Sequence, residues 1–201
     1  MPLEALKNLI IDHSTVPGKK CVVFDIDDTL LSEDSYPIVE VVKLLKFFRA
    51  HHMAVALVTA RHTSMRKFTI LELNAIDIKE TRDYLAEDLF FCPDSHRTSF
   101  VKISQWKNSS RKRMKLKYSS VFCTVGDQWT DLVEIKEEKE RQNLDIAYFT
   151  SAYPYLLFKL YDDHAEYGLK LKSDPIIQPK FVVLKVGSES QLTQSKLIFN
   201  D

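Results

Sequence analysis

Two aspartates, two residues apart, follow an apolar segment near the start of the chain. Residues 21–24 read CVVF, and Asp25 and Asp27 come directly after them. Side chains alternate along an extended backbone, so Asp25 and Asp27 point to the same side while Ile26 points to the other. The two carboxylates therefore converge on one point, where they could act on a reacting group or bind a metal ion. The alternative is a polar strand end that caps the next helix and does no chemistry.

Two later apolar segments, Met53–Val58 and Val121–Val125, also end in polar residues. If these segments are parallel strands, their carboxyl ends meet at one edge of the sheet, which is where sites form in such folds. The polar residues expected at that edge, together with one lysine from a basic helix, are Asp25, Asp27, Thr59, Lys107, Asp127 and Asp131. The sequence therefore predicts a carboxylate-rich site with one ammonium group.

Phosphoryl transfer is the chemistry that uses all of these groups. A phosphate monoester resists attack by an anion, so a site must neutralise charge and align the reacting groups. Asp25 and Asp127, with a backbone carbonyl near Asp27, could hold Mg²⁺, which prefers oxygen ligands. Thr59 and Lys107 could then bind the phosphoryl oxygens.

The two aspartates of the first segment would divide the reaction between them. Asp25 would be the nucleophile that forms an aspartyl-phosphate, which water then hydrolyses. Asp27 would protonate the leaving oxygen and later activate the water. That role needs a raised pKa, which burial near another carboxylate could supply.

The motifs resemble those of the haloacid dehalogenase (HAD) superfamily, in the form typical of class B and class C acid phosphatases and plant vegetative storage proteins. The similarity spans roughly residues 20–135 and rests on three segments in the family's order, at 24–31 (FDIDDTLL), 57–61 (LVTAR) and 126–132 (GDQWTDL). The resemblance implies a nucleophile at Asp25 and an acid/base at Asp27. It also implies Asp127 as a metal ligand, and we expect supporting roles for Asp131 and Arg61.

The lysine of the remaining motif has four candidates, Lys107, Lys112, Lys115 and Lys117. We favour Lys107, because plant members of the group have a lysine after an aromatic residue at the start of a basic helix. Trp106-Lys107 has that form, with Asn108 or Ser109 as the helix cap.

Helical patterns separate the predicted strands. Apolar residues at helical spacing predict helices at Leu3–Ile10 and Ile38–Ala50, and a third helix whose buried face is Met65, Phe68 and Leu71. Further strands are expected at Leu89–Cys92, Ile146–Phe149 and Phe181–Val186. This alternation predicts an α/β fold, a three-layer Rossmann-like parallel sheet with helices on both faces and a minimal or absent cap domain. We expect one HAD-like domain over residues 1–186 and a C-terminal tail over residues 187–201.

Composition excludes several classes of protein. The 201 residues carry 28 basic and 28 acidic side chains, so no general affinity for polyanions is implied. The three cysteines do not form a disulfide or zinc pattern, and no segment is long and apolar enough to cross a bilayer. With no leader sequence in view, we expect a cytoplasmic protein.

The resulting hypothesis is a Mg²⁺-dependent phosphatase that hydrolyses small phosphomonoesters. A nucleotide or polynucleotide phosphatase would suit the basic helix, so nucleic acid is a possible but not a favoured partner. A phosphotransferase would use the same residues. A non-catalytic storage or binding protein is a further alternative, although Asp25 is present. The sequence does not predict an oligomeric state.

Overall fold

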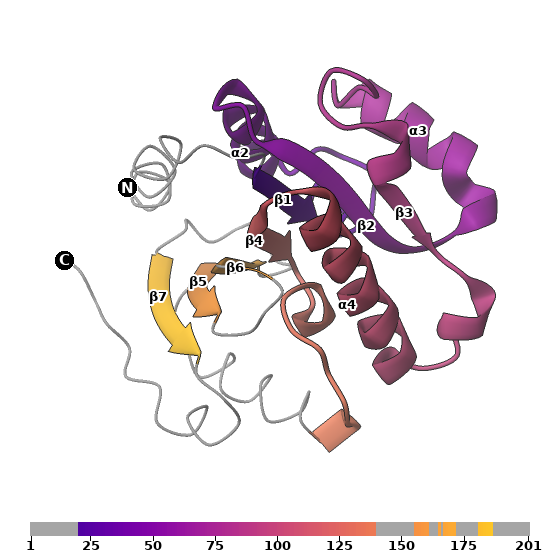
Figure 1. Cartoon of the computed structure of the whole chain (residues 1–201). Coiled ribbons are helices and arrows are strands. Elements are labelled where there is room, and N and C mark those ends of the chain that lie inside the picture. Colours follow the sequence, from indigo (N-terminus) through magenta and orange to yellow (C-terminus); the bar gives the residue numbers. More distant parts are fainter. Residues whose placement is uncertain (1–19, 140–154, 161–164, 166, 172–180, 187–201) are drawn as a thin grey trace.

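The computed structural model describes residues 20–139, 155–160, 165, 167–171 and 181–186, which form a sheet flanked by helices (Figure 1). The strands are β1 (Lys20–Phe24), β2 (Ala54–His62), β3 (Leu89–Cys92), β4 (Ser120–Gly126), β5 (Tyr155–Leu160), β6 (Tyr167–Leu171) and β7 (Phe181–Val186). The helices are α2 (Val39–Ala50), α3 (Arg66–Ala75) and α4 (Phe100–Lys117). The strand order is β3-β2-β1-β4-β6-β5-β7, and every neighbouring pair is parallel except β5 with β6.

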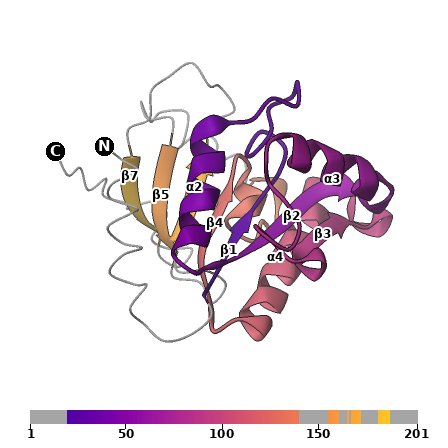
Figure 2. The ribbon, with the colours of Figure 1, turned by 90° about the horizontal axis from the view of Figure 1, so that it is seen from above.

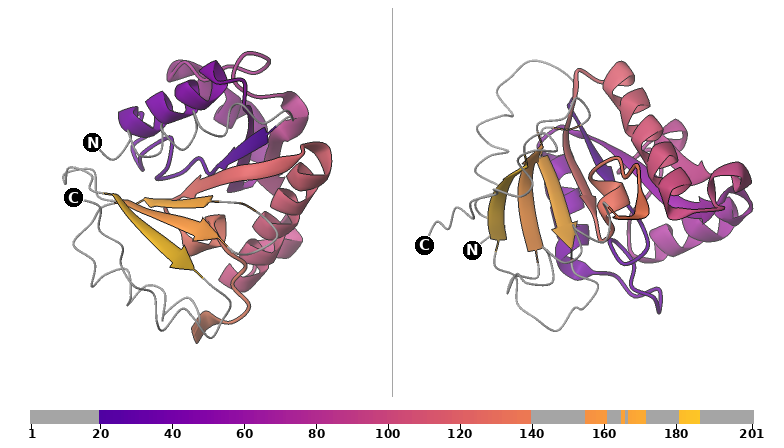
Figure 3. Two further views of the ribbon diagram at one scale, coloured as in Figure 1. Left: turned by 60° about the vertical axis from the view of Figure 1, so that its left-hand side comes forward. Right: turned by 90° about the horizontal axis from the view of Figure 1, so that it is seen from below.

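Two apolar clusters lie on opposite faces of the sheet. Val22 and Phe24 of β1 belong to the cluster that includes the buried residues of α2 and Leu73 of α3, whereas Val23 belongs to the cluster that includes Trp106 of α4. Alternation along the strand is the reason for this division. Figures 2 and 3 show the helices on the two sides of the sheet. The structure thus confirms the predicted three-layer α/β fold.

The strand ends differ from the sequence predictions at the edge that carries the polar residues. β3 and β7 have the predicted bounds. The first strand, which the apolar pattern predicts at Val22–Ile26, instead spans Lys20–Phe24 and ends before Asp25. β2 continues to His62, so Thr59 and Arg61 lie within the strand rather than in a loop after it. The pairing of β2 with β3 is irregular between Thr59 and His62. Polar residues are tolerated there because Arg61 and His62 are only partly buried.

The predicted buried face of α3 is wrong. Met65, Phe68 and Leu71 are 36%, 55% and 66% exposed, and Thr69 and Leu73 are buried instead. α3 has apolar residues around much of its circumference, so spacing alone could not choose its inner face. Contacts of Thr69 and Glu72 with Arg61 of β2 accompany the observed orientation.

The predicted start of the basic helix is also wrong. α4 begins at Phe100, where the Ser99 hydroxyl accepts a hydrogen bond from the backbone N–H of Lys102 at 3.3 Å. Such a cap satisfies an N–H that has no partner within the helix. Lys107 therefore lies two turns inside α4 rather than at its start.

Other predictions fall outside the described residues, or are not tested by them. The helix at Leu3–Ile10, the strand at Ile146–Phe149 and the tail over residues 187–201 lie outside. The single domain over residues 1–186 stays a prediction. Among the described helices, none combines the length and apolar character that a membrane span requires.

Candidate active site

A tight turn after β1 brings the first two aspartates to the edge of the sheet. The N–H of Asp25 still donates to the Val125 carbonyl of β4 at 2.9 Å, and the Ile26 carbonyl then accepts from the N–H of Leu30 at 2.9 Å. Between them, Asp28 adopts the left-handed conformation with φ of 52°. Aspartate is one of the few non-glycine residues that adopt this conformation readily. The third acid of the motif therefore shapes the turn.

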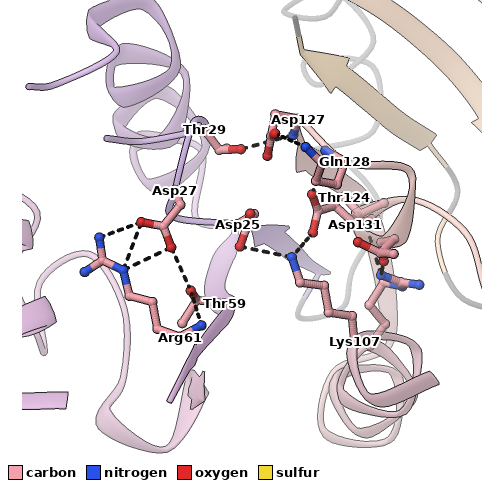
Figure 4. Close-up of polar contacts among 12 residues, drawn as sticks. Asp25, Asp27, Thr29, Thr59, Arg61, Lys107, Thr124, Asp127, Gln128 and Asp131 are labelled. Atoms are coloured by element: carbon pink, nitrogen blue, oxygen red, sulfur yellow. Dashed lines mark hydrogen bonds and ion pairs between the residues drawn. The ribbon is translucent and has the colours of Figure 1, made fainter. Parts of the chain in front are cut away.

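Lys107 is the positive charge at the centre of the site (Figure 4). Its Nζ lies 3.3 Å from Oδ1 of Asp25 and donates a hydrogen bond to Oδ1 of Asp131. All three side chains are buried. Burial lowers the pKa of the Lys107 ammonium, but Asp131 and Asp25 more than offset this and the net pKa is raised. Lys107 is therefore a permanently charged group.

Asp131 is held by hydrogen bonds from β4, from α4 and from the chain that follows β4. Its Oδ2 accepts from the N–H of Gln128 at 3.0 Å, and Gln128 is the N-cap of the short helical turn η4 (Trp129–Asp131). Its carbonyl accepts from Thr124 Oγ1 at 2.5 Å and from Arg111 Nη1 at 2.9 Å. These contacts leave Asp131 as an oriented partner of Lys107.

Asp127 is positioned by residues from two segments. Its N–H donates to Oγ1 of Thr29 at 3.2 Å, and its Oδ2 accepts from Nε2 of Gln128 at 2.6 Å. Thr29 belongs to the turn that follows Asp25, so this bond fixes the two carboxyl-bearing segments against each other.

The carboxylates fit a bound divalent cation. Asp25, Asp127 and Asp131 each offer an oxygen, and these oxygens lie within 4.8 Å of one another. Oδ1 of Asp25 is buried and accepts no hydrogen bond from the residues that the structure describes. Even with the cations Lys107 and Arg111 nearby, three buried carboxylates carry excess negative charge, and hard oxygen ligands suit Mg²⁺. The residues present therefore match the chemistry of such an ion.

The charge on Asp25 depends on its surroundings. Burial raises the pKa of the Asp25 carboxyl well above its ordinary value, Asp131 raises it further, and Lys107 opposes the shift. A divalent cation bound to this carboxylate would favour the ionised form, as metal ions do for their ligands. The site thus favours cation binding and ionisation of Asp25 together.

Asp27 lies apart from this buried cluster. Its side chain is 51% exposed and forms an ion pair with Arg61, with 2.6 Å between Oδ1 and Nη2. The Thr59 hydroxyl also donates to Asp27 Oδ2, at 3.4 Å. The expected burial of Asp27 near another carboxylate is therefore wrong, because the side chain turns toward Arg61, and Asp25 is the buried acid.

The structure brings the predicted residues into two adjacent groups. The inner group contains Asp25, Lys107, Asp127 and Asp131, and the outer group contains Asp27, Thr59 and Arg61 (Figure 4). Of the rival lysines, Lys112 and Lys115 are exposed, and Lys117 pairs with Asp88, which lies just before β3. Lys107 is thus the candidate lysine that contacts Asp25.

Sequence reasoning missed several residues that position the site. Thr29 and Gln128 lie inside the quoted motifs, where their polar side chains beside Asp25 and Asp127 were an available signal. Arg111 gave no signal, because it is one of several basic residues in α4 and only folding buries it.

Comparisons with known proteins identify a matching family and a similar fold. The family model described as HAD superfamily, subfamily IIIB (acid phosphatase) matches residues 32–150. A solved structure of the class C acid phosphatase from Bacillus anthracis is similar, with a TM-score of 0.53 and 12% identity over 86% of this chain and 74% of that one. The tungstate-bound structure of the same enzyme gives a TM-score of 0.51 at the same identity and coverage. No curated protein sequence matches the chain.

Gly126 is the residue whose lack of a side chain allows Asp131 to reach the site. A Cβ on Gly126 would lie 2.2 Å from Cβ of Asp131, which is closer than atoms can approach. We expect Gly126→Ala to lower the free energy of unfolding by about 2 kcal/mol, as overpacking does, and to lower the melting temperature by several degrees. Thermal unfolding followed by circular dichroism measures this.

A double-mutant cycle tests whether the clash with Asp131 causes the loss of stability. In an Asp131→Gly background the steric conflict is absent, so adding Gly126→Ala should cost much less stability. An equal loss in both backgrounds would show that the strain lies elsewhere.

The raised pKa of Asp25 predicts an effect of pH on stability. The folded protein binds the Asp25 proton more tightly than the unfolded chain, so stability falls as pH rises above about 4. In chelator at pH 7, Asp25→Asn should therefore be more stable than wild type and should have a higher melting temperature. The difference should shrink as the pH is lowered toward 4.

The same substitution at the exposed Asp34 is the control and should leave the melting temperature unchanged at both pH values. A variant at Asp25 that is less stable than wild type at pH 7 would contradict the argument from burial.

Proposed function

The chain belongs to subfamily IIIB of the HAD superfamily, the acid phosphatases, and we propose that it is a Mg²⁺-dependent phosphomonoesterase that works through a phosphorylated Asp25. The observation that carries this proposal is the buried contact of Asp25 with Lys107, beside Asp127 and Asp131. A non-catalytic storage protein has no need of an aspartate that is buried against other carboxylates at a cost in stability. The substrate is a small phosphomonoester.

The first half of the reaction transfers the phosphoryl group to the protein. An oxygen of the Asp25 carboxylate attacks phosphorus, and the bond from phosphorus to the leaving oxygen breaks with its electron pair on that oxygen. Asp27, in its protonated form, gives the proton to the leaving oxygen, and a neutral alcohol departs. The products of this step are the alcohol and an acyl phosphate on Asp25.

The second half restores the protein. Water attacks phosphorus and gives a proton to the Asp27 carboxylate, while the bond from phosphorus to Asp25 breaks. Orthophosphate leaves, Asp25 is again a carboxylate and Asp27 is again protonated. The partial exposure of Asp27 supports this role, because the group that exchanges protons with water and substrate must be accessible to both.

Asp25 and Asp127 are the residues that would hold Mg²⁺, with Asp131 within reach and the Asp27 carbonyl as a further predicted ligand. Such an ion supplies positive charge that offsets the phosphate and orients its oxygens. Lys107 adds a fixed positive charge beside the same carboxylates. Lys107 and the buried Thr59 hydroxyl at the edge of the sheet are the two expected phosphate ligands. A cytoplasmic location also stays a prediction.

Turnover of para-nitrophenyl phosphate tests the proposal directly. We expect hydrolysis with Mg²⁺, little with chelator, and a loss of kcat of at least about 10³-fold in Asp25→Asn, because no nucleophile remains. Mg²⁺ should also raise the melting temperature of wild type more than that of the variant, which reports binding independently of activity. The proposal fails if wild type with Mg²⁺ is no faster than Asp25→Asn.

A second comparison tests the lysine assignment. Lys107→Ala should lower kcat/KM by about 10²–10³-fold, as expected when one donor to the transferring group is lost, whereas Lys112→Ala should change it by less than about twofold. Circular dichroism of Lys107→Ala checks that the variant folds, since its loss leaves buried carboxylates uncompensated. Equal effects at the two positions would show that the lysine is misassigned.

A further inference from the structure

The guanidinium of Arg61 binds the Asp27 carboxylate through the edge that carries Nε and Nη2. Nε donates to both oxygens of Asp27 at 3.0 Å, and Nη2 donates to Oδ1 at 2.6 Å. A planar fork that binds both carboxylate oxygens fixes the direction of the carboxylate as well as its distance. The only other polar contact described for this carboxylate is the bond of 3.4 Å from Thr59, so Arg61 dominates its orientation.

The opposite edge of the same guanidinium is anchored to α3. Nη1 of Arg61 donates to Oγ1 of Thr69 at 3.0 Å and to Oε2 of Glu72. Glu72 is itself held, because Oε1 accepts from the Ser35 hydroxyl at 2.6 Å. The side chains of Arg61 and Glu72 are each only 10% exposed, in contrast to Asp27. Arg61 therefore connects a rigid, mostly buried anchor to a half-exposed carboxylate.

We infer that Arg61 is a positioning residue for proton transfer, which holds Asp27 toward the leaving oxygen, and that Thr69 and Glu72 of α3 hold Arg61. The inference rests on the proposed function of Asp27. A carboxylate that is half exposed and attached by a short side chain would otherwise sample several rotamers. A displacement of about 1 Å at a reacting group costs about 10²-fold in rate, so loss of this grip has a measurable effect.

The test must distinguish a loss of leaving-group protonation from a general loss of activity. A para-nitrophenolate ion leaves without a proton, whereas the alcohol of ethyl phosphate departs only if its oxygen is protonated. The ratio kcat/KM covers the steps up to departure of that group. We therefore compare kcat/KM for these two substrates in wild type, Asp27→Asn, Arg61→Met and the double variant, all with Mg²⁺.

We expect Arg61→Met to lower kcat/KM for ethyl phosphate by about 10²-fold and for para-nitrophenyl phosphate by less than about tenfold. Asp27→Asn should show the same substrate dependence with a larger loss, and the double variant should be no worse than Asp27→Asn. Arg61→Lys should not restore ethyl phosphate turnover, because an ammonium cannot bind Asp27 and α3 through a planar fork. Glu72→Gln should give a smaller loss of the same kind.

Arg66→Met is the matched control. Arg66 begins α3 and donates to the Ala86 carbonyl at 3.0 Å, so its loss removes an arginine from the helix that anchors Arg61 without touching Asp27. It should leave the ratio of the two kcat/KM values unchanged.

Two results would overturn the inference. Equal losses on both substrates in Arg61→Met would mean that the residue is only structural. A further rise in KM when Arg61→Met is added to Asp27→Asn would mean that Arg61 binds the substrate itself. The failure of the proposed function looks different, because wild type and Asp25→Asn would then turn over para-nitrophenyl phosphate equally.

Discussion

The compensation of buried carboxylates by one buried ammonium is the interaction on which the rest of the site depends. Asp25 and Asp131 both contact Lys107, and all three are shielded from water. Removing Lys107 from this group would leave buried carboxylates without a compensating charge, and such a loss costs about 3–5 kcal/mol in proteins. The raised pKa of Asp25 shows that the compensation is incomplete. A divalent cation would relieve that imbalance and would also offset the negative charge of a bound phosphate ester.

Much of the surrounding structure serves to keep Lys107 and Asp131 opposite each other. The Ser104 hydroxyl accepts from the N–H of Ile135 at 2.6 Å, and Arg111 binds the carbonyls of Thr130 and Asp131. These contacts fasten α4 to the chain that follows β4. Since the helix also packs on the sheet through Trp106, the ammonium and its carboxylates are fixed by packing as well as by charge.

The two halves of the site differ in rigidity, and the difference suits their proposed tasks. The inner half is buried and held by many hydrogen bonds, as a nucleophile and a cation site require. The outer half is accessible, with Asp27 half exposed. An accessible acid could move among rotamers, and the grip of Arg61, anchored by α3, restores the precision that burial provides for Asp25.

The sequence by itself determined the α/β fold and the residues that gather at the sheet edge, because alternating strand and helix patterns fix where the carboxyl ends of the strands meet. The sequence favoured Lys107 because Trp106-Lys107 matches the motif, although the predicted start of its helix was wrong. Only the tertiary structure decided that α4 starts at Phe100, that α3 exposes Phe68, and that Asp25 rather than Asp27 is buried. Spacing along the chain gives the direction of a side chain relative to its own element. Burial and charge pairing depend on which other elements pack there, and residues far apart in the sequence, such as Asp27 and Arg61, meet only in the fold.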